Sequence, residues 1–316
     1  MPEQARNHGS SHLLSQVLSH VPGRANDRAP EDHATIHVAD QLHVVLRRLV
    51  AAADGGQPLQ AFLYAAGASQ IVADRLQGTA AGPRLLVTAA TAVRGRMGLA
   101  GWHVLLRDLA VVLAEAVIDS TEQEAAAILL SVRSAVEGLR LGLRGQAARL
   151  YSNALLRSPA VFGDLDLRPD DVVALAQRFS LQRPDRDRPL LVLGLRTSGA
   201  YLAPLFSAAL GRLEYRHVVT RTTRPGGPLL PEESGLPEAV RRVGGLVLLV
   251  AAPPRTGAEL ASVASRLRDA GFAAERIVPV YAALDEDEHP PPRLRGHAAV
   301  ILPASQWARQ RAISGG

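Results

Sequence analysis

The chain has 316 residues, of which 47% are hydrophobic, and its formal net charge is +5 at pH 7. It contains no cysteine and no lysine, so all 35 basic residues are arginine. This composition excludes disulfides, thiolate nucleophiles, Schiff-base lysines and lysine-containing phosphate loops. No basic run interleaves with aromatic residues, and no apolar run reaches the about 18 residues of a membrane span. We therefore expect a cytoplasmic protein with no dedicated nucleic-acid surface and no membrane association.

The first half of the chain predicts a tail followed by an all-α domain. Residues 1–33 are polar and broken by proline and glycine, which indicates a disordered tail. Residues 34–157 have the apolar periodicity of a helical bundle with short connections. Six helices are expected, over residues 34–53, 58–76, 83–97, 102–118, 120–139 and 146–156.

The helical domain carries no motif for catalysis. Six of the ten histidines lie within the first 43 residues, but their spacing is irregular and neither a cysteine nor a convincing carboxylate ligand joins them, so no metal site is predicted. The helices have enough apolar surface to pack on the second half of the chain or on a second copy of the protein. We treat the domain as a candidate surface for a second copy of the chain or for a protein partner.

The second half predicts an α/β domain. Residues 158–188 form a connector that includes one capped helix, with Asp170 and Asp171 in its first turn. Residues 189–316 alternate apolar runs with helical patterns, which favours a parallel sheet. The expected strands cover residues 190–193, 215–220, 246–250, 277–282 and 298–302.

One strand–loop–helix unit lies at residues 243–272. Its strand is the continuous apolar run LVLLV, which is typical of a strand buried on both faces. Two prolines end the strand, and Thr256 and Gly257 then open a helix. The backbone amides of Thr256, Gly257 and Ala258 would lie at the positive end of that helix, which suits a phosphate group.

A second unit of the same kind lies at residues 189–210. The strand PLLVLGL is followed by a polar loop and then by a helix. The loop consists of Arg196, Thr197, Ser198 and Gly199, and it is a candidate site for pyrophosphate. Without lysine in the chain, arginine must neutralise any such anion.

The two units together resemble the type I phosphoribosyltransferase superfamily. LGLRTSG lies where that family binds pyrophosphate, and VLLVAAPPRTGA lies where it binds the 5-phosphate of phosphoribosyl pyrophosphate (PRPP). The resemblance covers the C-terminal half of the chain. It departs from the family at the two acidic ribose-binding positions, which are Ala251 and Ala252 here.

The resemblance implies a protein that binds PRPP or a nucleotide and transfers a phosphoribosyl group. In that case Arg196 would act together with Arg221 or Arg224, which would close over the ligand from a flexible loop at residues 221–235, and Mg²⁺ would be the cofactor. The two alanines cannot hold ribose hydroxyls or support magnesium. They favour the alternative of an inactive module that senses a nucleotide or phosphate, or that engages a protein partner.

Overall fold

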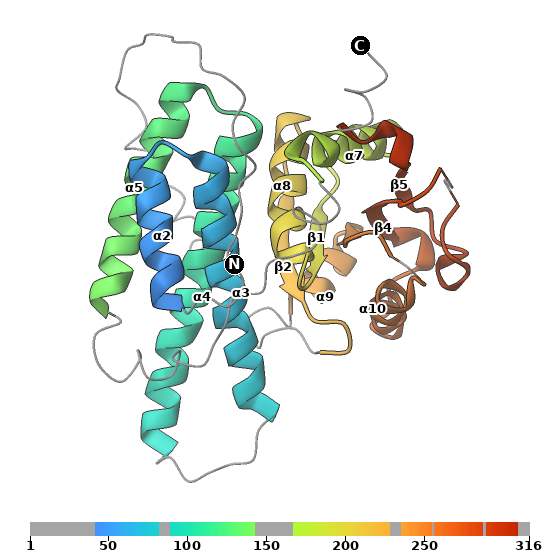
Figure 1. Cartoon of the computed structure of the whole chain (residues 1–316). Helices are drawn as coiled ribbons and strands as arrows, with labels where there is room; N and C mark the ends of the chain where they lie inside the picture. Colours follow the sequence, from blue (N-terminus) through green and yellow to red (C-terminus); the bar gives the residue numbers. More distant parts are fainter. Residues whose placement is uncertain are drawn as a thin grey trace, which may run out of the picture.

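The computed structural model describes residues 42–81, 89–142, 167–227, 235–254, 256–286 and 289–308. A helical region precedes an α/β region, as the sequence predicts (Figure 1). The expected tail, the expected helix over 146–156 and residues 228–234 of the expected flexible loop lie outside the described residues. Among the described helices, none is both long and apolar enough to cross a membrane.

The helical region contains four described helices. They are α2 (Leu42–Asp54), α3 (Pro58–Ala81), α4 (Ala89–Ile118) and α5 (Glu122–Gly142). The start of α5 is capped, because Thr121 and Glu124 exchange hydrogen bonds between side chain and backbone.

The prediction of two helices over 83–97 and 102–118 is wrong, because α4 runs through that break. Gly98 and Gly101 lie inside α4, where each disfavours the helix by only about 1 kcal/mol relative to alanine. The second half of α4 is buried in the core at Leu106, Leu109 and Leu113. The free energy gained from this burial outweighs the low helix propensity of the two glycines.

The α/β region is built on a five-stranded, fully parallel sheet with the strand order β2-β1-β3-β4-β5. The strands are β1 (Leu190–Leu195), β2 (Val218–Thr223), β3 (Leu246–Val250), β4 (Ile277–Ala282) and β5 (Val300–Leu302). The bounds of β3 and β4 match the predicted ones. β2 begins three residues later than predicted, because Tyr215 packs on Phe179, with 5.5 Å between the ring centroids.

Helices cover both faces of this sheet. α7 (Pro169–Gln182) and α8 (Gly199–Arg212) share a core with one face, and α9 (Leu236–Arg242) and α10 (Ala258–Asp269) share a core with the other. The short 3₁₀ helices are η2 (Ala274–Arg276), η3 (Pro292–Leu294) and η4 (Ala304–Gln306). The sequence assigned α7 to the connector. In the structure α7 packs against the sheet, and Arg178 of α7 donates a hydrogen bond of 2.6 Å to the carbonyl oxygen of Ile301 in β5.

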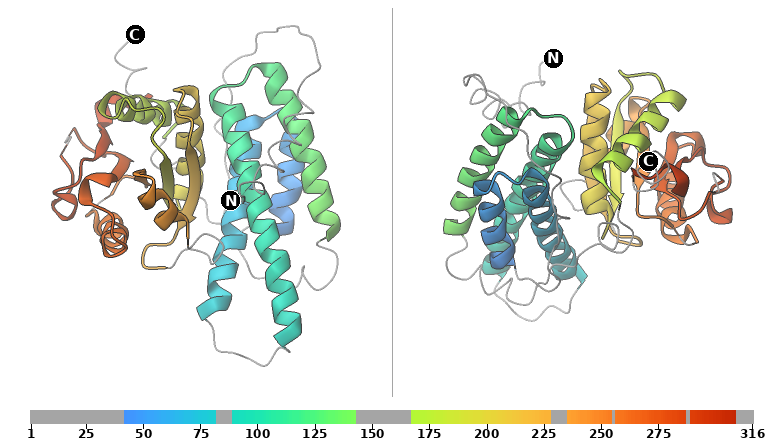
Figure 2. Two further views of the ribbon diagram at one scale, coloured as in Figure 1. Left: turned by 180° about the vertical axis from the view of Figure 1, so that it is seen from behind. Right: turned by 45° about the horizontal axis from the view of Figure 1, so that its top comes forward.

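The helical region and the sheet share one hydrophobic core. α8 lies between the helical bundle and β1, as Figure 1 and Figure 2 show from different sides. Every residue of α8 from Gly199 to Leu210 is buried, and a single cluster of apolar side chains extends from α2 through α8 to β5. Apolar side chains from both sides of the predicted domain boundary near residue 188 therefore pack in the same cluster.

Candidate functional site

The candidate site lies where the strand order reverses. β1 has β2 on one side and β3 on the other, so the chain leaves β1 in one direction and later builds the sheet in the opposite direction. Open α/β sheets bind ligands outside the carboxyl ends of their strands at such a switch point. The register pairs Gly194 of β1 with Val250 of β3, so the two loops predicted to bind anions begin at neighbouring strand ends.

The turn from β1 into α8 is held by close backbone contact. A Cβ atom on Gly194 would lie 2.1 Å from the carbonyl oxygen of Gly199, and one on Gly199 would lie 2.4 Å from the carbonyl carbon of Gly194. Only glycine fits at either position. Thr197 and Ser198 are half-buried, and their carbonyl oxygens accept hydrogen bonds from the first amides of α8. The loop is thus a tight turn that fixes the backbone position of Arg196.

Two of the predicted arginines meet at one carboxylate. Arg196 follows β1, and Arg224 follows β2. The Nη1 atom of Arg196 lies 2.8 Å from Oδ1 of Asp74, and the Nη2 atom of Arg224 lies 2.7 Å from Oδ2. Arg224 also donates from Nε to Oδ1 at 2.8 Å. Asp74 belongs to α3, so this cluster joins the helical region to the carboxyl edge of the sheet.

The three side chains differ in exposure. The side chain of Arg196 is 2% exposed, that of Asp74 is 26% exposed and that of Arg224 is 52% exposed. The hydrogen bond to Asp74 raises the pKa of Arg224 above its ordinary value. Two guanidinium groups and one carboxylate leave the cluster with a net positive charge. Since Arg224 is half-exposed, an anion from solution can reach the cluster from that side.

Arg221 has a different environment from the other two predicted arginines. It lies within β2 and not in a flexible loop, and its Nη1 atom donates a hydrogen bond of 2.6 Å to the carbonyl oxygen of Thr220. The chain turns sharply after β2, where the amide of Gly227 donates to the carbonyl of Arg224 at 3.0 Å. Arg224 is therefore the arginine at the end of β2 that reaches the cluster.

The loop after β3 carries the predicted phosphate residues. Thr256 is exposed, and its Oγ1 accepts a hydrogen bond of 3.3 Å from the amide of Ala258. Gly257 has φ of +69°, and a Cβ atom on it would lie 3.2 Å from side-chain carbons of Leu294 and Pro291. The side of this turn that faces η3 is apolar and offers no hydrogen-bond donor from these two side chains to an anion.

The two alanines at the end of β3 lie against opposite sides of the sheet. Ala251 is 9% exposed and belongs to the core that includes α10. Ala252 is partly buried and packs against the core that includes α8. Their methyl groups supply no oxygen ligand, so these two side chains do not fit a magnesium ion.

A cavity of about 880 Å³ opens beside this loop, at the carboxyl end of β4. Its polar lining comes from Tyr281, Asp285, His289 and Arg295, and a run of prolines forms another wall. The charged and proline-rich composition of residues 285–292 indicates only a solvated loop. Composition alone does not show that such a loop folds back toward the sheet edge.

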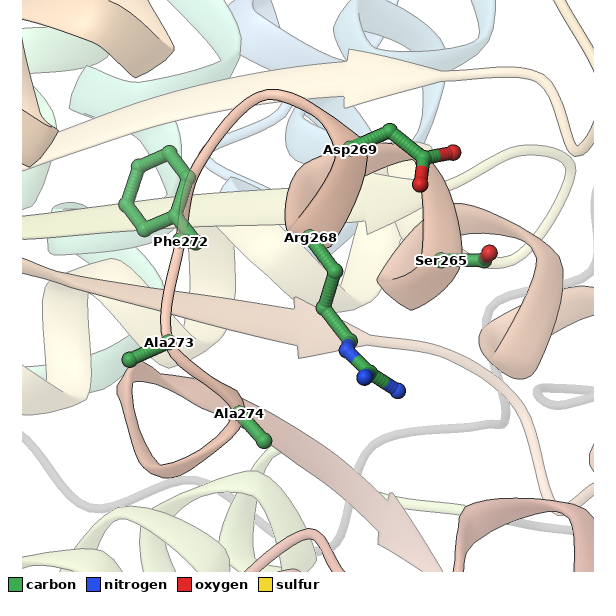
Figure 3. Close-up of a pocket in the computed structure, with 6 residues that line it drawn as sticks. All are labelled: Ser265, Arg268, Asp269, Phe272, Ala273 and Ala274. Atoms are coloured by element: carbon green, nitrogen blue, oxygen red, sulfur yellow. The ribbon is translucent and has the colours of Figure 1, made fainter.

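A second hollow and the side chain of Trp307 lie away from the switch point. A second hollow of about 490 Å³ lies at the end of α10, lined by Ser265, Arg268, Asp269, Phe272, Ala273 and Ala274 (Figure 3). It is at the opposite edge of the sheet, where β4 begins. Trp307 is 8% exposed and donates a hydrogen bond from Nε1 to the carbonyl oxygen of Leu302, so it is a packing residue.

Asp74 is the site residue that sequence reasoning missed. It is the only acidic residue in the 24 residues of α3, and it lies among apolar residues. This isolation is the one signal in the sequence, but it does not identify a partner 122 residues away. No known protein family, curated protein or solved structure matches the chain.

Proposed function

We propose that this chain binds a phosphorylated ribose ligand, such as PRPP or a nucleotide, at the carboxyl edge of its sheet and serves as a sensing module. The observation that carries the proposal is the pair of arginines at the switch point, both held by Asp74 of the helical region. Arginine binds phosphate with two parallel hydrogen bonds, so the pair suits a phosphate or pyrophosphate group. The resemblance to phosphoribosyltransferases adds the ribose to this expectation.

Sensing is favoured over group transfer by the end of β3. A transferase of this kind relies on acidic groups for the ribose hydroxyls, and both positions are alanines packed against the cores. Hydrogen bonds to charged groups contribute about 1.5–3 kcal/mol each, so two missing ones lower the affinity for PRPP by roughly 10² to 10⁴. Because the two arginines contact Asp74 of the helical region, ligand binding would also affect that region.

Transfer of a phosphoribosyl group is the second candidate function. The observation in its favour is that both predicted anion loops begin at neighbouring strand ends. Catalysis of this type depends on positioning and charge stabilisation, so it requires no nucleophilic side chain. The large cavity beside β4 would then be available to an acceptor.

Calorimetric titration of the whole chain with PRPP, with and without magnesium, tests the proposal. We expect weak binding that changes little with magnesium, and comparable titrations with nucleoside monophosphates show which ligand is preferred. Absence of binding to PRPP, to nucleoside monophosphates and to pyrophosphate by a folded protein would overturn the proposal. Tight, magnesium-dependent binding of PRPP would favour the transferase instead.

A further inference from the structure

Asp74 occupies the arginine pair in the way that a ligand anion would. Its two carboxylate oxygens accept hydrogen bonds of 2.7–2.8 Å from Arg196 and Arg224. The carboxylate comes from α3, and both arginines come from the edge of the sheet. The helical region therefore places a monoanion of its own on the groups that the proposed function assigns to the ligand.

The charges decide which ligands can replace this carboxylate. A monoanion such as a carboxylate gains no more from the two guanidinium groups than Asp74 already does, and it must also bind from dilute solution. A phosphate dianion or a pyrophosphate carries more charge and more acceptor oxygens, so its hydrogen bonds to arginine are stronger. Any anion that binds beside Asp74 without displacing it is repelled by the carboxylate.

We propose that Asp74 is the specificity-determining residue of this site: it excludes monoanions and yields to polyanions such as pyrophosphate or a phosphorylated ribose. The inference rests on the proposed function. Binding of the polyanion replaces the contact between Asp74 and the two arginines. Ligand binding therefore changes the contacts of α3, the helix that carries Asp74.

A second ion pair connects the same two regions at a different place. The Nε atom of Arg212 in α8 lies 3.2 Å from Oδ1 of Asp119, which follows α4, and its Nη1 atom donates to the carbonyl of Ile118 at 3.2 Å. This pair also joins the helical region to the α/β region, but it lies at the other end of α8 from the turn that carries Arg196. Asp119 therefore offers a matched control for Asp74.

The test is calorimetric titration of the full chain with pyrophosphate, for the wild type, Asp74→Asn and Asp119→Asn. Removing the competing charge should tighten pyrophosphate binding on the order of tenfold in Asp74→Asn, because the neutral amide no longer repels the ligand. Asp119→Asn should bind as the wild type does. Acetate, which has the chemistry of the missing carboxylate, should compete with pyrophosphate in Asp74→Asn and not in the wild type.

Several outcomes would overturn the inference. If the wild type binds pyrophosphate and Asp74→Asn binds equally or more weakly, Asp74 orients the arginines and does not compete. An equal gain in Asp119→Asn would show that any loosening of the two regions has the same effect. If neither the wild type nor Asp74→Asn binds while both are folded, the proposed function falls, and the inference falls with it. Should Asp74→Asn not fold, Asp74→Ser repeats the test, and failure of both to fold would make Asp74 a structural residue.

Discussion

The loop after β1 and the loop after β3 begin at neighbouring strand ends, but they differ in packing. The first has the buried Arg196, which is fixed by a glycine turn and by the carboxylate of Asp74. The second has the exposed Thr256, and Gly257 packs near η3.

This difference shows that similar strand–loop–helix patterns can have unlike physical roles. The loop after β1 connects the sheet to the helical region through Asp74 and through α8. The loop after β3 connects the sheet to α10 and η3, which belong to the same α/β region. An anion that binds at the first loop therefore acts on the helical region directly, whereas one at the second loop does not.

The largest expected effect comes from removing the helical region. α8 is buried between the bundle and the sheet, so a fragment of residues 167–316 would expose apolar side chains of α8 to water. Each large apolar side chain that becomes exposed costs about 1.5–3 kcal/mol, so we expect a loss of roughly 5 kcal/mol or more in the free energy of unfolding. Chemical denaturation of the fragment and the whole chain measures the difference. Equal stability of a soluble, monomeric fragment would show that the first loop does not depend on the bundle.

A second comparison uses one glycine from each loop. Gly194→Ala places a Cβ atom 2.1 Å from backbone, so we expect it to cost about 3 kcal/mol or more in unfolding free energy. Gly257→Ala forces alanine into a left-handed conformation, which costs about 1–2 kcal/mol, and its Cβ meets only side chains that can move. Urea denaturation of the two variants gives the order. If Gly257→Ala is the more damaging change, the second loop is the more rigid one.

The alanines at the end of β3 provide the next prediction. The resemblance suggests that aspartate at positions 251 and 252 would tighten PRPP binding and restore magnesium dependence. Because Ala251 is buried in the core that includes α10, we expect Ala251→Asp to lower the unfolding free energy by about 2–3 kcal/mol, and the partly buried Ala252→Asp to lower it less. Thermal unfolding of the single variants tests this order. Unchanged stability in both would mean that both carboxylates reach the solvent-filled edge of the sheet.

The smallest effect is expected at the start of α10. Thr256→Val removes the hydroxyl that accepts from the amide of Ala258 and keeps the shape of the side chain. One such hydrogen bond contributes about 1 kcal/mol, and the exposed position allows water to replace part of it. Hydrogen exchange at the first amides of α10 measures the change. A much larger loss would indicate that the conformation of the whole loop after β3 depends on the Thr256 hydroxyl.

The sequence predicted the fold class and several strands well for a physical reason. β3 and β4 are continuous apolar runs buried on both faces, so composition alone sets their ends. The ends of β2 and the continuity of α4 were not predicted. Tertiary packing, and not local conformational preference, decides the structure at Tyr215 and at the two glycines of α4.

The site was predictable only in part. Both anion loops follow from their glycine and arginine patterns, and their meeting at one edge follows from the parallel sheet. The role of Asp74 did not follow, because no local pattern links α3 to residues 122 and 150 positions away. The same reason explains why Arg196 is buried, although its loop has the composition of an exposed turn.

The central claim is that the arginine pair at the switch point binds a phosphorylated ligand. The most direct measurement compares PRPP affinity by calorimetry in two double variants of equal charge, Arg196→Gln with Arg224→Gln and Arg212→Gln with Arg216→Gln. The control arginines are both more than half exposed and form their ion pairs with Asp119 and Asp187. We predict that the first double variant loses affinity by about 100-fold or more, since two charge-assisted hydrogen bonds are removed, while the control keeps the wild-type affinity. Equal affinities in the two variants would contradict the claim, because the ligand would then respond only to the overall charge.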